Sequence, residues 1–316
     1  MTIVPAWVSG AGTMTLTEQR ILAAILMLGM TASGRAIGQI APSAPQNLAP
    51  ETPVPLFDFR ESDIKFQLST LMNALRDSRH EGWVLAAYPD PKTSRPLIGA
   101  GFGLDVPATE HTQRDPLNPH PFLEPSTAQL WQAAGLDSEK LQTILDQYDR
   151  ELKAWKKKNF RKKIRTHALS PELTEEEAKK LLRISAIQAT YNARAYCREF
   201  DQLTASQQMA LSQLVFQMGT NLEEFTQFLS AINDGPSHAD FARSESNAEP
   251  EAEHWKTVQT TLIQSQWARR YSSRAVAVIA MFDPNYNNDP KAAERKVQAT
   301  LRPLSRHRKK KSVAHA

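Results

Sequence analysis

The chain has 316 residues, of which 41% are hydrophobic and 23% are charged, as is usual for a soluble globular protein. Its formal net charge of +4 suits an acidic polymer such as cell wall, nucleic acid or anionic lipid, without choosing among them. The single cysteine, Cys197, excludes an intrachain disulfide, and we expect it to be a buried small hydrophobic residue. The histidines show no HxxxH or HExxH spacing, so we predict no metal and no cofactor.

The N-terminal segment is typical of an export signal. The apolar run from Ile21 to Met30 follows Arg20 and is far shorter than the roughly 20 residues that span a bilayer. We therefore expect residues 1–38 to be a signal peptide or an N-terminal anchor, and the Pro-rich residues 39–56 to be a linker. This places the protein in the periplasm or outside the cell, with inner-membrane anchoring as an alternative. A buried helix is the other interpretation of the run.

A helix and a small β unit are predicted next, at the start of a folded domain over 57–285. Apolar residues spaced by three and four mark one helix face within 62–80, and we expect this helix to end at Gly82. The prolines and glycines within 83–104 exclude a helix and favour short strands with a proline-bearing turn.

Most of the remaining chain is predicted to be helical. Thr174 and Glu177 form a capping box that opens a long helix toward Phe200, and Gly219 is placed to end the helix over 205–218. Other helices are expected over 126–134, 138–158, 222–233, 251–264 and 272–281, with a loop over 107–125. The basic tail over 286–316 has no core-forming pattern and is expected to be disordered. The predicted class is therefore α+β and mainly α.

A pair of carboxylates is the chemically suggestive feature. Glu81 ends the first predicted helix, and Asp90 follows nine residues later in the strand-turn unit. Glycoside hydrolysis needs two carboxyl groups, one protonated to donate to the leaving oxygen and one ionised. Trp83 and Tyr88 would provide an apolar environment for Glu81, whereas Asp90 lies in a turn and would stay charged. Spacing alone is weak evidence, because most such pairs are surface residues.

Three stretches resemble the phage-type lysozymes, the mainly helical muramidases of the endolysin family. The first runs from Glu81-Gly to Asp90 and on to Leu97-Ile-Gly-Ala-Gly101. The second is Leu173-Thr-Glu-Glu-Glu-Ala-Lys-Lys-Leu-Leu182. The third begins with Ala210-Leu-Ser-Gln-Leu-Val-Phe-Gln-Met-Gly219 and continues through Phe225, Ser265-Gln-Trp267 and Arg274-Ala-Val-Ala-Val-Ile279. The resemblance covers about 62–282.

This resemblance implies a lysozyme-like fold with a small β-hairpin lobe and a helical lobe. It implies cleavage of peptidoglycan between N-acetylmuramic acid and N-acetylglucosamine, with Glu81 as general acid and Asp90 as its ionised partner. Arg274 matches the family's arginine that pairs with the catalytic glutamate. Expected substrate-binding residues are Gly99, Gly101 and Gln217.

Two departures from the family pattern stand out. Leu97 replaces the threonine that positions the hydrolytic water, so the inverting or retaining outcome stays open, and Thr93 or Ser94 is expected to substitute. An insert over about 107–170 has no counterpart in the family. Its basic run, 156–165, is either a solvated face or a surface for anionic envelope polymers or lipid.

Each assignment has a less specific alternative. Glu81 could be a salt-bridge partner at a helix end, Asp90 a turn residue, and Arg274 an exposed helical cation. Gly99 and Gly101 could be strand kinks, and Gln217 could belong to the core. The alternative function is a catalytically impaired lysozyme-fold protein that binds peptidoglycan or acts in envelope assembly. No nucleic-acid partner is expected, because the basic segments lack interleaved aromatic residues, and a monomer is predicted.

Overall fold

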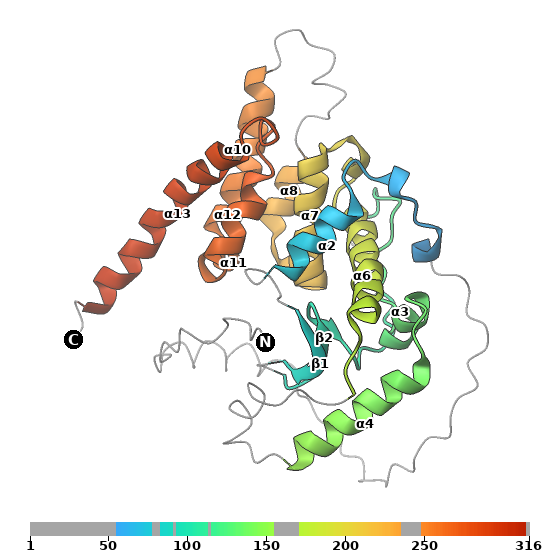
Figure 1. The fold of residues 1–316 in the computed structure, drawn as a ribbon. Helices are drawn as coiled ribbons and strands as arrows, with labels where there is room; N and C mark the ends of the chain where they lie inside the picture. The colour runs from blue at the N-terminus through green and yellow to red at the C-terminus, as the bar shows by residue number, and fades with distance from the viewer. Residues whose placement is uncertain are drawn as a thin grey trace, which may run out of the picture. The chain divides into compact units, whose positions relative to one another are not determined.

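The computed structural model of the chain describes residues 55–77, 83–90, 93–112, 115–154, 171–234 and 248–313. The predicted signal, most of the predicted linker and the basic run 156–165 lie outside these residues. The described part is mainly helical, with one three-stranded antiparallel sheet that precedes most of the helices (Figure 1). The predicted mainly helical α+β class is therefore confirmed.

The first α-helix in the described ranges, α2, spans Leu68–Arg76 and buries Leu68, Leu71 and Leu75 on one face, in the predicted three-and-four spacing. A short 3₁₀ helix, Glu61–Asp63, precedes it. The prediction that this helix reaches Gly82 is wrong, because Asp77 adopts φ −59° and ψ 137° and so leaves the helical conformation. Gly82 itself lies outside the described residues.

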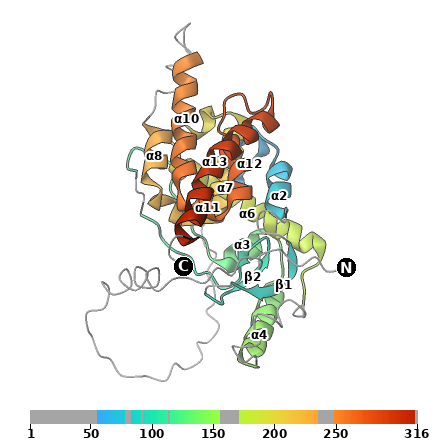
Figure 2. The ribbon, with the colours of Figure 1, turned by 90° about the vertical axis from the view of Figure 1, so that its left-hand side faces the viewer.

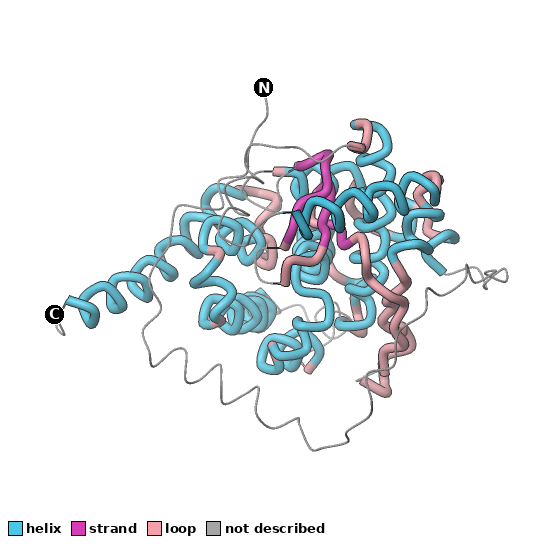
Figure 3. Tube along the Cα trace, turned by 90° about the horizontal axis from the view of Figure 1, so that it is seen from below, coloured by secondary structure: helices cyan, strands magenta, loops and turns pink. Residues whose placement is uncertain are grey.

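The sheet has the order β1-β2-β3, with β1 at Val84–Pro89, β2 at Pro96–Gly99 and β3 at Phe102–Gly103. In the β1–β2 hairpin Val84 pairs with Gly99 and Tyr88 with Leu97, so β1 carries two more residues than β2 between these pairs. Such an irregularity bends and twists a strand. Figure 3 shows the three strands together among the helices.

The insert contains two helices that pack beside the sheet and α6. Helix α3 spans Thr127–Ala133 behind a capping box on Ser126, and α4 spans Ser138–Ala154. Helix α3 contacts α6, and α4 contacts β1 (Figure 1). Apolar side chains fix them in place, and the buried ones are Leu130, Trp131, Leu141, Ile144 and Tyr148.

Helix α6, Glu175–Tyr196, is the central element. Thr174 and Glu177 form the predicted capping box at its start. Residues from Ala178 onward are buried on most sides, and the helix contacts α2, α3, α7 and β2. The helix ends before the predicted Phe200, because Cys197 has an extended backbone; Phe200 begins a 3₁₀ turn. Cys197 is buried, as predicted.

The helices after α6 pack on one another, as Figure 2 shows from the side. They are α7 (Ala205–Met218), α8 (Thr226–Asn233), α10 (Ala248–Gln264), α11 (Gln266–Arg270), α12 (Ser272–Ala280) and α13 (Pro290–Val313). Gly219 ends α7 with φ +51°, a conformation that favours glycine, as predicted. The ring of Phe282 joins α8 and α10, with centroids 5.8 Å from Phe228 and 6.3 Å from Trp255.

Helix α13 corrects the disorder predicted over 286–316. Pro290 occupies its first turn, and the buried Ala293, Val297 and Leu301 lie on one face. Helix α13 contacts α10, α11 and α12. Among all the helices in the described ranges, none is both long and apolar enough to cross a membrane.

Candidate functional site

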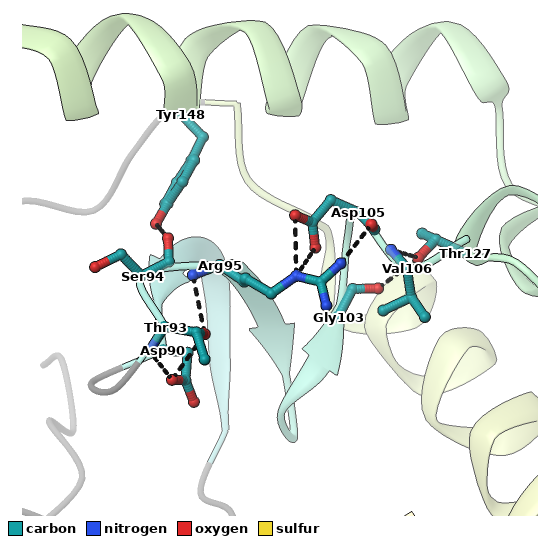
Figure 4. A network of polar contacts seen from close by, with 9 residues as sticks. All are labelled: Asp90, Thr93, Ser94, Arg95, Gly103, Asp105, Val106, Thr127 and Tyr148. Atoms are coloured by element: carbon teal, nitrogen blue, oxygen red, sulfur yellow. Dashed lines mark hydrogen bonds and ion pairs between the residues drawn. The ribbon is translucent and has the colours of Figure 1, made fainter. Parts of the chain in front are cut away.

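Asp90 lies directly after β1, at the start of the tight turn that leads into β2. Its main chain closes the turn: Asp90 N–H donates to the Arg95 carbonyl at 2.8 Å, and the Asp90 carbonyl accepts from Ser94 N–H at 2.9 Å. Its Oδ1 accepts from the backbone N–H of Thr93 at 2.7 Å and from the Thr93 hydroxyl at 2.9 Å (Figure 4). Aspartate favours such turns because its carboxylate binds backbone two or three residues on. The half-buried carboxylate is therefore held in one orientation.

Thr93 and Ser94 differ in how they relate to Asp90. The Thr93 hydroxyl binds the Asp90 carboxylate and accepts from Arg95 N–H at 3.3 Å, so it orients Asp90 directly. Ser94 has φ +62°, which is uncommon for a residue other than glycine, and its carbonyl accepts a hydrogen bond from Tyr148. Leu97, at the family's threonine position, is half-buried and pairs with Tyr88 across the hairpin.

Glu81 lies outside the described residues, but a cluster around Glu175 holds the residues on both sides of it. From α2, Arg76 contacts Glu175 Oε1 at 2.5 Å; from the start of the hairpin, Trp83 Nε1 donates to Glu175 Oε2 at 2.8 Å. The Arg76 guanidinium also lies 4.3 Å from the centre of the Trp83 ring. This Glu175 cluster therefore ties the end of α2 to the start of β1.

The two expected substrate-binding glycines lie where β2 leads into β3. Gly99 has φ +64° and Gly101 φ +91°, which lets the chain turn tightly between these strands. A Cβ built on Gly99 would lie 4.0 Å from the Trp83 ring. Strand geometry thus accounts for both glycines, while Gly99 also lies beside the aromatic residue next to the Glu81 segment.

Gln217 and Arg274 come from the helices. Gln217 Oε1 accepts a hydrogen bond from Trp267 Nε1 at 3.0 Å, which ties α7 to α11 and favours a structural role for this oxygen. Arg274, on α12, has only 3% of its surface exposed, and its guanidinium lies 5.7 Å from the Tyr271 ring centre. The alternative that Arg274 is an exposed helical cation is therefore wrong.

The sequence did not indicate Tyr148. This residue lies on α4, and its hydroxyl donates to the Ser94 carbonyl at 2.7 Å. The sequence also did not indicate the contact between Arg95 and Asp105, in which Arg95 Nε lies 3.1 Å from Asp105 Oδ1 (Figure 4). Both contacts support the turn that holds Asp90. Neither has a signal in the sequence, because the residues come from segments without a shared motif.

A separate pocket of about 330 Å³ lies at the C-terminal end of α6, where the insert loop meets α8. His111 Nε2 lies 2.5 Å from Glu223 Oε1 there, and Arg198 Nε donates to Asp115 Oδ2 at 2.6 Å. The hydrogen bond from Arg198 holds the pKa of Asp115 below its usual value. These pairs join the insert loop to the helical part of the chain, and none of the predicted site residues that the structure describes lines the pocket. We therefore interpret the pocket as structural.

Within the described ranges, no group of three or more His, Cys, Asp or Glu side chains could hold a metal ion. The chain matches no model of a known protein family and no curated protein sequence.

Proposed function

We propose that the chain is a peptidoglycan hydrolase that cleaves between N-acetylmuramic acid and N-acetylglucosamine by acid/base catalysis. In this proposal the fold is lysozyme-like, with the three-stranded sheet as the small lobe and the helices as the large lobe. Glu81, protonated, donates to the glycosidic oxygen. Asp90, ionised, activates water or stabilises the oxocarbenium ion that develops on the sugar. Such a substrate fits the export signal expected over 1–38.

The observation that carries the proposal is the orientation of the Asp90 carboxylate. Two hydrogen bonds from Thr93 hold it at the hairpin turn, at the far end of the strand that follows the Glu81 segment. A catalytic carboxylate must keep a fixed position relative to the scissile bond, because small displacements cost large factors in rate. An aspartate without such bonds would change rotamer freely in solvent.

The burial of Arg274 supports the same assignment. A buried guanidinium is costly unless an anion pairs with it, and the resemblance supplies Glu81 as that anion. The positive charge of Arg274 favours the ionised form of a neighbouring carboxyl group. The acid role of Glu81 therefore requires that burial of its carboxyl outweighs this charge.

A second candidate function is a protein that binds peptidoglycan without turnover. The observation that favours it is the environment of Thr93, whose hydroxyl is already bonded to Asp90 and to Arg95 N–H. With leucine at position 97, the family's water-positioning hydroxyl has no direct replacement there. A catalytic protein would then have to position its water with Asp90 itself.

Digestion of purified peptidoglycan separates the two functions. Wild type should release new reducing ends, and Glu81→Gln and Asp90→Asn should each abolish their release. Glu224→Gln and Asp58→Asn are matched controls, because both carboxylates are exposed and belong to elements other than the hairpin, and both variants should keep full activity. Binding to the wall without release of reducing ends by wild type would favour the second function and refute the first.

Analysis of the released fragments defines the bond. A muramidase leaves N-acetylmuramic acid at the reducing end, whereas a glucosaminidase leaves N-acetylglucosamine. The anomeric form of the first product distinguishes the two mechanisms, which require carboxyl separations of about 6.5–9.5 Å for inversion and about 5–5.5 Å for retention.

A further inference from the structure

A buried tyrosine of the insert contacts the turn of the hairpin. Tyr148, on α4, has 3% of its surface exposed, and its hydroxyl donates to the Ser94 carbonyl at 2.7 Å. Figure 4 shows the phenol pointing from the helix onto the turn between β1 and β2. The Ser94 carbonyl has no partner in the strand ladder, and the Tyr148 hydroxyl supplies its hydrogen bond from outside the hairpin.

Hydrogen bonds within the turn connect Ser94 to Asp90. Ser94 N–H donates to the Asp90 carbonyl at 2.9 Å, and the neighbouring Thr93 binds the Asp90 carboxylate twice. A displacement of Ser94 would therefore displace the main chain and the carboxylate of Asp90 together.

Tyr148 can hold the turn only if the insert is itself held in place. Two other contacts hold the insert. At the start of α3, the Thr127 hydroxyl donates to the Gly103 carbonyl at 2.8 Å and accepts from Val106 N–H at 3.0 Å (Figure 4). At the start of α4, Lys140 contacts the Glu177 carboxylate at 2.6 Å and so ties the insert to the first turn of α6. Helix α4 is thus held relative to both the sheet and the central helix.

The surroundings of the Tyr148 hydroxyl keep it protonated, so that it can donate its hydrogen bond. Burial, followed by the negative charges of Asp105, Asp149 and Asp90, raises the pKa of Tyr148 above its usual value. The hydroxyl therefore stays protonated at any pH at which a hydrolase would be assayed, and the bond to Ser94 does not depend on pH in that range.

We propose that the insert is a brace for the Asp90 turn, and that Tyr148 is the positioning residue that holds this turn in its productive geometry. The catalytic part of the inference rests on the proposed hydrolase function. The structural part, that the tyrosine hydroxyl holds the turn, is independent of it.

The test uses Tyr148→Phe in the full chain, which removes the hydroxyl and keeps the ring in the core. Tyr286→Phe is the control, because it removes the same hydroxyl from a half-buried tyrosine in the segment between α12 and α13. Amide hydrogen exchange of peptides covering 90–95 should become about three- to tenfold faster in Tyr148→Phe, the change expected for loss of one hydrogen bond, and should not change in Tyr286→Phe.

Hydrolysis of a soluble peptidoglycan fragment supplies the second readout. In Tyr148→Phe, kcat should fall by about three- to tenfold with little change in KM, since a positioning residue acts on the transition state more than on binding. Unchanged exchange over 90–95 overturns the brace, whatever the activity, and faster exchange with wild-type kcat overturns the positioning role. If wild type does not hydrolyse peptidoglycan, the proposed function fails, and the exchange data alone still decide whether Tyr148 holds the turn.

Discussion

Replacing Glu175 by alanine should destabilise the fold clearly more than the same change at its neighbour Glu176 in the first turn of α6. Glu175 accepts a hydrogen bond from Trp83 Nε1 at 2.8 Å and forms an ion pair with Arg76, so the substitution removes two contacts at once. The Arg76 and Glu175 side chains are 30% and 42% exposed, which places the ion pair near the surface value of about 0.5–1 kcal/mol. The tryptophan bond to this partly exposed charged acceptor adds about 1.5 kcal/mol, the lower end of the range for such bonds.

The expected loss in the free energy of unfolding is therefore about 2 kcal/mol, or roughly 4–8 °C in Tm for a unit of this size. Denaturant and thermal unfolding would both measure it. Glu175→Gln should lose less, because the amide oxygen still accepts from Trp83. In a double-mutant cycle with Arg76→Met, the coupling energy should be about 0.5–1 kcal/mol.

Glu176→Ala is the matched control for this prediction. Glu176 lies in the same helical turn, so both substitutions remove the same favourable interaction with the helix dipole. Its carboxylate is 77% exposed and pairs only locally with Lys179, so its loss should be clearly smaller. Equal losses for Glu175→Ala and Glu176→Ala would refute the reasoning, because the dipole would then account for the whole effect.

Three further predictions concern single side chains. Thr93→Val removes the hydroxyl bond to Asp90 but keeps the backbone N–H, so hydrolysis should fall by about three- to tenfold with little change in Tm; wild-type rates would contradict the orienting role. Burial raises the pKa of the Cys197 thiol to about 12, so a disulfide reagent at pH 8 should modify it only after denaturation, and rapid reaction of the native protein would contradict this. Burial alone would raise the pKa of Glu177, but hydrogen bonds from Lys140 and the capping contacts lower it below 4.5. The stability it contributes should thus be complete above about pH 4.5 and be lost as pH falls through the folded-state pKa. Unfolding curves of wild type and Glu177→Gln should converge in acid, and a constant difference would contradict the assignment.

Local chemistry made parts of the fold predictable. The capping box of Thr174 and Glu177, the stop at Gly219 and the strand-turn character of 83–104 each depend on residues close together in the chain. The start of α13 also had a local signal that the charge of the tail obscured. Asp289 caps the helix by accepting from Ala292 N–H at 2.9 Å, and Pro290 suits a first helical turn.

Contacts between distant segments were not predictable. The turn at Asp90 could be identified from its neighbours, but its contact with Tyr148 joins the hairpin to an insert with no matching motif. The same holds for Glu175, whose role depends on Trp83, 92 positions earlier. The end of α2 at Arg76, in contrast, had a local signal, because no apolar residue follows Leu75 until Trp83.

Helix α6 has a consequence for how the protein unfolds. It contacts the sheet through β2, the insert through α3, and the other helices through α2 and α7. Its buried hydroxyls bond within the helix, Ser185 to the Leu181 carbonyl and Thr190 to the Ala186 carbonyl, so apolar neighbours can surround it. Sheet and helices should therefore melt in a single cooperative transition, and the amides at the centre of α6 should be the last to exchange with solvent.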